Sequence, residues 1–171
     1  MKVGILSFQG SFLDHSKSIH ELGYESLLIK QSKDLTSLDA LILPGGESTA
    51  MKKINQFSNL LSDVDRLIKD GVPTLTTCAG TILLAKEVID GEVTIPNIDI
   101  EVTRNAYGRQ TESFEGSVRF FDNDDIYCFI RAPKISKILS DKVNVIARHN
   151  DEIVGVAQKN IVSLTFHPEL N

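Results

Sequence analysis

Short apolar runs alternate with amphipathic stretches in the first half of the chain, and this alternation constrains the fold more than any other feature. The apolar runs lack polar–apolar alternation, as expected for strands that are covered on both faces. They are residues 2–8, 24–30, 41–43 and 72–77. The stretches with apolar side chains at helical spacing are residues 11–22, 57–68 and 81–89. Strands that alternate with helices predict an α/β fold with an open, mixed, mainly parallel sheet and helices on both faces.

The stretch over residues 57–68 has the clearest helical periodicity in the chain. Its apolar stripe consists of Phe57, Leu60, Leu61, Val64, Leu67 and Ile68. Such a stripe, one helical turn after another, is typical of a helix that packs one face on a core. We therefore expect one amphipathic helix with these six side chains on its apolar face.

The second half of the chain consists of short β-rich pieces joined by turns. We expect antiparallel strands there, which pack on or extend the same sheet, over residues 98–104, 116–121, 126–131, 143–149, 153–158 and 161–166. Asn150-Asp151 predicts a hairpin between two of them. No repeat or linker separates the two halves, so the 171 residues predict one domain.

Composition narrows the range of partners and compartments. Eighteen Lys and Arg against 23 Asp and Glu give a net charge of −5, which argues against a nucleic-acid surface. No apolar run approaches the roughly 20 residues of a membrane span, and the first residues predict a buried strand rather than a signal peptide. Cys78 and Cys128 are the only cysteines, too few for a disulfide scaffold. We expect a cytoplasmic protein that binds neither nucleic acid nor membrane.

The first candidate for chemistry is Cys78, which stands between a predicted strand and a predicted helix in the segment Thr76-Thr77-Cys78-Ala79-Gly80. A nucleophile on a tight strand-to-helix turn projects from the sheet edge, and small neighbours allow the sharp bend. The helix N-terminus also favours the thiolate. Alternatively, Cys78 is a small buried apolar residue, as free cysteines usually are.

Two further segments also follow predicted strands. The glycine pair in Pro44-Gly45-Gly46-Glu47-Ser48 lets backbone N–H groups approach a ligand and support an oxyanion, or simply forms a turn. Near the end of the chain, His167 is a candidate general base, and Glu169 a carboxylate that can fix its tautomer. In an extended chain both side chains point to one side. The alternative is a surface His beside a surface Glu.

The remaining cysteine and histidines suggest no further site. Cys128 alternates with Tyr127 and Phe129 in a β-rich run, and we expect it in the core. His15, His20 and His149 show no metal-ligand spacing with either cysteine. The sequence therefore predicts no metal site.

Several segments together resemble a known family. They are Phe8-Gln9-Gly10 with His15, and residues 43–49, 77–80, 104–110, 129–133 and 165–170. In this order they resemble the class I (triad) glutamine amidotransferases, whose sheet is flavodoxin-like. Among these they are similar to the glutaminase subunits of pyridoxal 5′-phosphate synthase. One departure is Thr76, where that family usually has Gly.

The resemblance implies hydrolysis of L-glutamine to glutamate and ammonia, with no cofactor. The ammonia would pass to a separate (β/α)8-barrel synthase subunit in a hetero-oligomer. Cys78 would be the nucleophile, His167 the base and Glu169 its orienting group. The implied glutamine contacts are Gly46, Glu47, Ser48, Arg104, Ile130 and Arg131.

Chemistry is consistent with these assignments. The N–H groups of Gly46 and Ala79 would hold the oxyanion, and Arg104 or Arg131 the substrate carboxylate. Glu47 would either meet the substrate ammonium or support its loop.

Other interpretations remain open at this stage. One is another cysteine hydrolase on the same scaffold, such as a γ-glutamyl hydrolase or a DJ-1-like protein, against which residues 104–110 and 129–133 argue. A second is a catalytically silent partner subunit that regulates a synthase. A flavodoxin-like nucleotide binder fits less well, because no phosphate-binding fingerprint follows the first strand.

Overall fold

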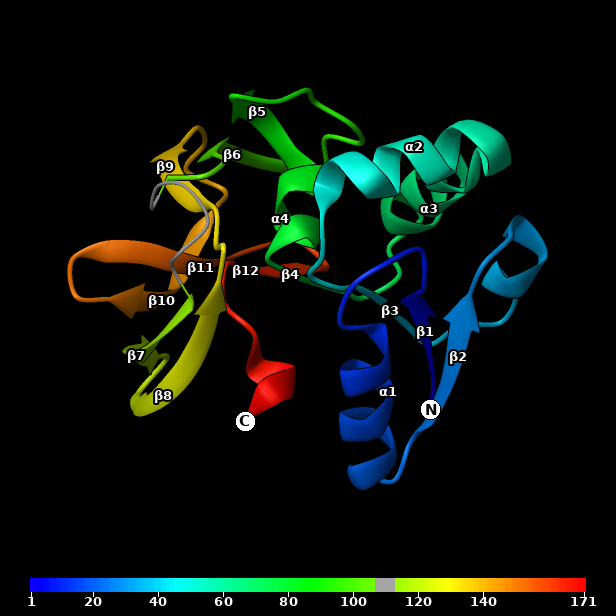
Figure 1. Ribbon diagram of the computed structural model, residues 1–171, viewed down its shortest axis with the longest axis horizontal. Helices are drawn as coiled ribbons and strands as arrows, with labels where there is room; N and C mark the ends of the chain where they lie inside the picture. Colours follow the sequence, from blue (N-terminus) through cyan, green and yellow to red (C-terminus); the bar gives the residue numbers. More distant parts are fainter. Residues whose placement is uncertain (107–112) are drawn as a thin grey trace.

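The computed structural model describes residues 1–106 and 113–171, and its centre is a nine-stranded sheet (Figure 1). The parallel half contains β1 (Lys2–Leu6), β2 (Glu25–Ile29), β3 (Ala40–Leu43), β4 (Thr74–Thr77) and β12 (Ile161–Leu164). The antiparallel half contains β7 (Ser113–Phe120), β8 (Asn123–Ile130), β10 (Asn144–His149) and β11 (Glu152–Gln158). The strand order is β2-β1-β3-β4-β12-β11-β10-β7-β8. The prediction of an open, mixed α/β sheet extended by antiparallel strands is confirmed.

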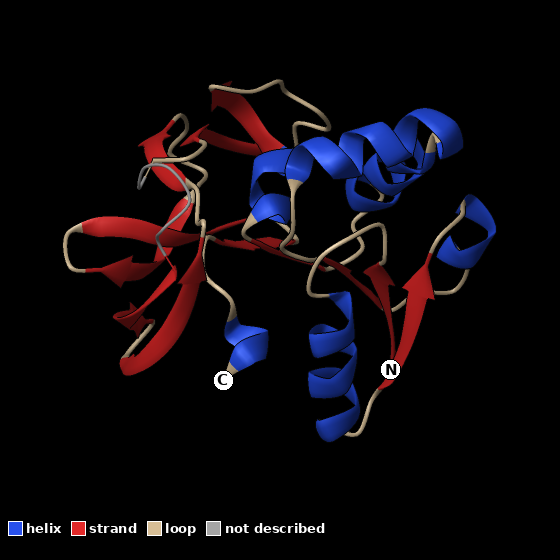
Figure 2. Cartoon of the chain, viewed as in Figure 1, coloured by secondary structure: helices blue, strands red, loops and turns tan. Residues whose placement is uncertain are grey.

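Helices cover both faces of the sheet, as predicted (Figure 2). They are α1 (Phe12–Glu21), α2 (Ser48–Ser58), α3 (Leu60–Lys69) and α4 (Ala79–Leu84), with short 3-10 turns η1 (Ser32–Leu35) and η2 (Pro168–Leu170). α1 packs Phe12 and Ile19 on one face, beside Ile5. α3 packs Leu61 and Val64 into the core on the other face, with Leu41. Within the described residues, none of the helices is both long enough and apolar enough to cross a membrane.

The predicted helix over residues 57–68 is instead parts of two helices. Asn59 adopts a left-handed conformation with φ of 51°, which ends α2 and starts α3 in a new direction. Asn55 stabilises the break, because its backbone carbonyl accepts the Asn59 N–H and its side-chain Oδ1 accepts the Leu61 N–H. Phe57 therefore belongs to α2 and is 92% exposed, so its predicted place on the buried stripe is wrong. Most of the remaining stripe is buried in α3 as predicted.

The structure also contains a second, three-stranded sheet, and two further expectations differ from the observed strands. It consists of β5 (Ala85–Ile89), β6 (Ile98–Thr103) and β9 (Lys134–Ile138). The predicted helix over 81–89 ends at Leu84, because residues 85–89 find ladder partners in β6 instead. β6 and β12 were expected to be antiparallel. Each has one antiparallel neighbour, β9 and β11 respectively, but each also pairs in parallel with a strand from the first half. The hairpin predicted at Asn150-Asp151 is present between β10 and β11.

Strand β8 places alternate side chains on opposite sides. Phe129 is fully buried in a core cluster with Phe166, and Tyr127 packs against the same cluster. Cys128 lies between them on the other side of the strand and is only half-buried. The predicted core position of Cys128 is therefore wrong. Side chains alternate along a strand, so the two aromatic neighbours face the core and Cys128 faces away from it.

Candidate active site

Three loops that follow neighbouring parallel strands meet at one edge of the main sheet. β3, β4 and β12 lie side by side and run in the same direction, so their carboxyl ends share that edge. Gly45 and Gly46 follow β3, Cys78 follows β4, and His167 follows β12. Ligand sites in open α/β sheets form at this edge. The structure thus brings together the three segments that the sequence singles out.

Cys78 occupies a strained turn between β4 and α4. Its φ of 46° and ψ of −105° lie in a region that non-glycine residues rarely adopt. The turn is held from both sides, because the Cys78 N–H donates to the Leu164 carbonyl at 2.9 Å and the Thr81 N–H donates to the Cys78 carbonyl at 3.1 Å. A Cβ at Gly80 would stand 2.1 Å from the Leu43 carbonyl oxygen, so α4 can approach β3 this closely only with glycine there.

Thr76, at which the sequence departs from the family pattern that it resembles, lies on β4 just before this turn. Its side chain is fully buried, and its hydroxyl lies 2.7 Å from the Ser163 hydroxyl and 3.1 Å from the Thr81 hydroxyl. The Thr81 hydroxyl in turn donates to the Leu164 carbonyl at 2.6 Å. The added hydroxyl is therefore hydrogen-bonded, which removes the cost of burying it.

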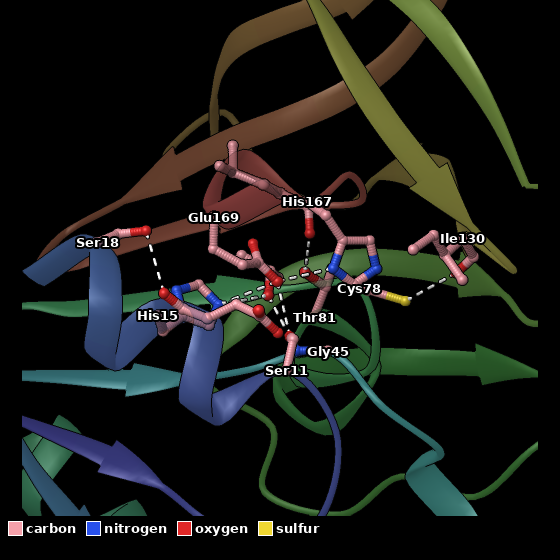
Figure 3. Close-up of polar contacts among 12 residues, drawn as sticks. Ser11, His15, Ser18, Gly45, Cys78, Thr81, Ile130, His167 and Glu169 are labelled. Atoms are coloured by element: carbon pink, nitrogen blue, oxygen red, sulfur yellow. Dashed lines mark hydrogen bonds and ion pairs between the residues drawn. The ribbon is translucent and has the colours of Figure 1, made fainter. Parts of the chain in front are cut away.

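His167 and Glu169 form a buried pair beside Cys78 (Figure 3). His167 Nδ1 lies 2.8 Å from Glu169 Oε1. Glu169 reaches the ring through the 3-10 turn η2, so the extended alternation expected for this segment is wrong although the two side chains do meet. The Cys78 thiol donates to the Ile130 carbonyl at 3.5 Å, and His167 Nε2 has no hydrogen-bond partner among the described residues. The ring therefore presents an unoccupied Nε2 on the side opposite its carboxylate.

The electrostatics of the pair favour an imidazolium beside an ionised carboxylate. Burial by itself lowers the pKa of His167, but interactions with Cys78 and Glu169 outweigh it and raise that pKa to about 10. Burial by itself raises the pKa of Glu169, but hydrogen bonds from His15 and His167 outweigh it and hold that pKa well below its usual range. A histidine beside a cysteine, oriented in turn by a carboxylate, is the arrangement that activates cysteine nucleophiles.

Two residues that the sequence analysis did not assign to the site also contact Glu169. Ser11 Oγ donates to Glu169 Oε1 at 2.6 Å, and His15 Nε2 lies 3.3 Å from the same oxygen. Both stand in the first turn of α1 and its N-cap. Their spacing of four residues was the available signal, since it places both on one face of a helix that starts after a strand.

A cavity of about 360 Å³ opens beside the sulfur and is lined by residues from five of the predicted segments. The predicted residues on its wall are Gly46, Glu47, Cys78, Ile130, Arg131 and His167. Four further lining residues were not predicted as contacts: Gln9, Gly10, Ser11 and Gly45. Gln9 Oε1 accepts the Glu47 N–H at 2.6 Å and so fixes the glycine loop. The volume is within the range of small-molecule sites.

Glu47 and Arg104 form an ion pair at the rim of this cavity. Glu47 is the N-cap of α2, and its carboxylate accepts the N–H groups of Thr49 at 3.1 Å and Ala50 at 2.8 Å. Arg104 Nη2 lies 3.3 Å from the Glu47 carboxylate and 3.2 Å from the Thr49 hydroxyl. Burial by itself raises the pKa of Glu47, but these hydrogen bonds and the nearby guanidinium lower it. Of the two roles left open for Glu47, support of its loop is therefore visible in the structure.

The other predicted residues lie next to the cavity rather than on its wall. Ser48 is buried at the start of α2, and Ala79 is buried at the first position of α4. Arg104 reaches the rim through Glu47. The Tyr107-Gly108-Arg109-Gln110 part of one motif lies outside the described residues. Across residues 1–106 and 113–171, no three His, Cys, Asp or Glu side chains gather in a way that could hold a metal ion.

Known proteins are similar in sequence to this chain over its full length. A relative from Methanocaldococcus jannaschii, named pyridoxal 5′-phosphate synthase subunit PdxT, is 46% identical over 172 residues, which cover 100% of this chain and 91% of the relative. A relative of the same name from Corynebacterium jeikeium is 44% identical over 177 residues, covering 100% and 90%.

Two solved structures have folds similar to that of this chain. A crystal structure of a glutamine amidotransferase has a TM-score of 0.91 at 36% identity, covering 99% of this chain and 91% of that one. The structure of PurLQS from Thermotoga maritima shares only the fold, with a TM-score of 0.77 at 15% identity over 98% of this chain and 87% of that one. The SNO glutamine amidotransferase family matches residues 5–171. With this match and relatives of such identity over its full length, the chain belongs to the SNO glutamine amidotransferase family.

Proposed function

We propose that the chain is the glutaminase subunit of a pyridoxal 5′-phosphate synthase and hydrolyses L-glutamine through Cys78, His167 and Glu169. The observation that carries the proposal is the buried His167–Glu169 pair at 2.8 Å, set beside a cysteine on a strained turn at a cavity. The subunit assignment is supported by the relatives named pyridoxal 5′-phosphate synthase subunit PdxT. We further propose that residues 1–171 act as one glutamine amidotransferase domain.

Glutamine would lie in the cavity with its side-chain amide toward Cys78 and its charged end toward the rim. Arg131, on the cavity wall, and Arg104, at the rim, are the two candidate partners of the α-carboxylate. Charge-assisted hydrogen bonds of this kind contribute roughly 1.5–3 kcal/mol. Glu47, which already supports the loop and lies 3.3 Å from Arg104, is the candidate partner of the α-ammonium. Gly46, Ser48 and Ile130 would complete the contacts.

The first half-reaction would form a glutamyl thioester. The Cys78 thiolate attacks the amide carbon, and the carbonyl π electrons move to oxygen, where the N–H groups of Gly46 and Ala79 would hold the oxyanion. His167 then gives its Nε2 proton to the departing nitrogen, and the C–N bond breaks to release ammonia. Throughout this step Glu169 keeps the His167 ring oriented through Nδ1.

The second half-reaction would return the enzyme to its starting state. Neutral His167 takes a proton from water through Nε2, and the resulting hydroxide attacks the thioester carbon. The tetrahedral intermediate collapses with cleavage of the C–S bond, which releases glutamate and restores the thiolate beside the imidazolium. Both half-reactions use the same two groups, and neither needs a cofactor.

The ammonia would be used by a partner, a (β/α)8-barrel synthase subunit in a hetero-oligomer. Ammonia becomes unreactive once it is protonated in water, so a useful site releases it against the surface of the enzyme that consumes it. We therefore expect the isolated chain to hydrolyse glutamine only weakly. A reducing cytoplasm suits the two free thiols and is the compartment that we propose.

The decisive experiment measures glutamate release by the chain alone and with a synthase subunit, together with glutamine-dependent formation of pyridoxal 5′-phosphate. We expect co-purification of the two subunits and a large rise in glutamate release on mixing. A γ-glutamyl peptide in place of glutamine should give little product. Preference for the peptide would favour the γ-glutamyl hydrolase interpretation, and no hydrolysis of either substrate by the complex would favour a silent subunit.

Replacement of Gly45 by alanine should remove activity without unfolding the chain. The new Cβ would stand 2.3 Å from His167 Cε1 and 3.1 Å from Cys78 Cβ, so the catalytic ring must shift. Displacements of about 1 Å in an active site cost on the order of 100-fold in rate. We expect at least that loss in kcat for glutamate release by the complex.

Gly71→Ala is the matched control for this variant. Gly71 has a φ of +97° and no atom within 4 Å of an added Cβ, and it follows α3 away from the site. Alanine there should lower the free energy of unfolding by about 1 kcal/mol through backbone strain and leave kcat unchanged. Equal kcat values for Gly45→Ala and Gly71→Ala would contradict the close packing of His167 on the glycine loop.

A further inference from the structure

The carboxylate of Glu169 has more partners than the reaction described above uses. Its Oε1 atom receives Ser11 Oγ at 2.6 Å and faces His167 Nδ1 at 2.8 Å and His15 Nε2 at 3.3 Å (Figure 3). All three partners come from outside η2 itself, and two of them come from α1. The His15 and Glu169 side chains are 4% and 1% exposed, so water cannot replace these contacts.

The neighbours of His15 Nε2 indicate whether this ring nitrogen donates or accepts a hydrogen bond. Two oxygens face this nitrogen at 3.3 Å, one from the Glu169 carboxylate and one from the Thr77 hydroxyl. An ionised carboxylate only accepts hydrogen bonds. A lone pair on Nε2 would face the lone pairs of that carboxylate, whereas an N–H can donate to it. His15 Nε2 therefore carries a proton that points between Glu169 and Thr77.

Ser11 gives a second, independent indication that the start of α1 is arranged for the carboxylate. A serine at an N-cap usually accepts a backbone N–H of its own helix. Ser11 is the N-cap of α1, yet its side chain makes no such bond and donates to Glu169 instead. The N-terminus of this ten-residue helix also carries the positive end of its dipole, which favours an anion there.

The same contacts link the carboxylate to the glycine loop. Thr77 Oγ1 accepts the Gly45 N–H at 2.9 Å, and the Ser11 N–H donates to the Gly45 carbonyl at 3.2 Å. A closed ring of polar contacts therefore runs through Glu169, His15, Thr77, Gly45 and Ser11. Of these residues, His15 alone touches both the carboxylate of Glu169 and the strand that ends in Cys78.

We propose that His15 is a positioning residue for the glutaminase reaction, which holds the Glu169 carboxylate in place for His167 and ties it to the Cys78 strand. The inference rests on the proposed function, since it assigns a role within the same site. Without the His15 N–H, a buried carboxylate at the end of a short 3-10 turn has lost one of its three partners. Glu169 then spends time away from His167 Nδ1, and the ring loses its orientation.

The test compares three replacements of His15 in the complex with the synthase subunit. His15→Leu removes the N–H and keeps an apolar side chain of similar bulk. His15→Gln keeps an N–H donor, because the terminal amide of glutamine reaches the position of Nε2. His15→Asn places its amide where Nδ1 stands and so cannot make the contact. The control is His20→Gln, which changes an exposed histidine on the same helix.

We expect His15→Leu and His15→Asn to lower kcat by 10- to 100-fold with KM for glutamine within about threefold, as misplaced catalytic groups do. His15→Gln should recover kcat to within about fivefold of the wild type, and His20→Gln should equal the wild type. A purely structural role predicts instead that all three His15 variants lose activity in proportion to their loss of folded protein. Unchanged kcat in His15→Leu, or no recovery in His15→Gln, overturns the proposal.

A measurement without substrate separates this proposal from the proposed function. In the isolated chain, the proton on His167 Nδ1 should give a downfield NMR resonance through its hydrogen bond to Glu169. The resonance should persist in His15→Gln and disappear or broaden in His15→Leu. Its persistence in His15→Leu overturns the role of His15. If His15→Leu loses the resonance but the wild-type complex hydrolyses no glutamine, the proposed function fails while the positioning of Glu169 by His15 stands.

Discussion

Replacement of Cys78 by alanine is expected to reduce glutamate release by the assembled complex by a factor on the order of 10⁴–10⁶, the range found when the nucleophile of a triad is removed. The variant keeps the glycine loop, the His167–Glu169 pair and the cavity, so glutamine should still bind. Only the covalent route through the thioester is lost. The measurement is kcat for glutamate release, with the dissociation constant of glutamine from calorimetry as a check on binding.

Cys128→Ser is the matched control, since it changes the other free thiol in the same neighbourhood. The His167 N–H donates to the backbone carbonyl of Cys128 at 2.9 Å. A change of side chain leaves that bond in place, so kcat should stay within about twofold of the wild type. A glutamine-like electrophile should label Cys78 and spare Cys128. Substantial glutamate release by Cys78→Ala would mean that the thiol is not the nucleophile.

The strand ends could be predicted from sequence because the relevant information is local. Leu41–Leu43, followed by Pro44 and two glycines, shows where a strand ends, and residues 72–77 followed by Cys78 show the same. Parallel topology then places such ends on one edge of the sheet. The convergence of Cys78, Gly46 and His167 follows from this rule without any knowledge of side-chain packing.

Two helix predictions fail because the structure of a segment depends on hydrogen bonds that its own hydrophobic pattern does not show. Residues 85–89 continue a helical pattern, but β6 offers them a hydrogen-bonding ladder and they form a strand. Phe57 fits the periodicity of the next helix, but Asn59 takes a left-handed conformation and starts that helix afresh. The first is a tertiary effect that propensity alone does not determine, whereas the second depends on local hydrogen bonds to Asn55 that the hydrophobic periodicity does not show.

The contacts of Glu169 show the same limit within the site. Ser11 and Glu169 are 158 positions apart, and their hydrogen bond closes the fold by joining its first helix to its last turn. His15 has the appearance of an ordinary polar residue on an amphipathic helix, and only its burial against the carboxylate reveals another role. The sequence therefore predicts the candidate nucleophile, base and carboxylate, while the contacts of Ser11 and His15 with that carboxylate are found in the structure.

Glu169→Gln is expected to lower kcat by a factor of 10³–10⁴ with a modest change in KM, by analogy with the loss when a triad carboxylate becomes an amide. The glutamine side chain keeps the size of Glu169 but carries no charge, and one of its two terminal groups is a donor that cannot accept from His167 Nδ1. The imidazolium then loses its counter-ion, and the pKa of His167 should fall from its raised value. Glu101→Gln is the matched control, because Glu101 is also a buried carboxylate with a cation partner, Lys137, in the second sheet. It should lower stability without changing kcat.

The difference in the free energy of unfolding between the wild type and Glu169→Gln should depend on pH in a direction fixed by the two shifted pKa values. Because the pKa of Glu169 is lowered, its contribution is present above its ordinary value of 4.5 and is lost as the pH falls towards the folded-state pKa. Because the pKa of His167 is raised to about 10, its contribution is present below its ordinary value of 6.5 and is lost as the pH rises through about 10. The advantage of the wild type should therefore be largest between about pH 4.5 and pH 6.5, and should shrink as the pH falls below or rises above this range. Urea titrations at several pH values measure it. A difference that stays constant from acid to alkaline pH would mean that Glu169 and His167 do not form an ion pair in the folded protein.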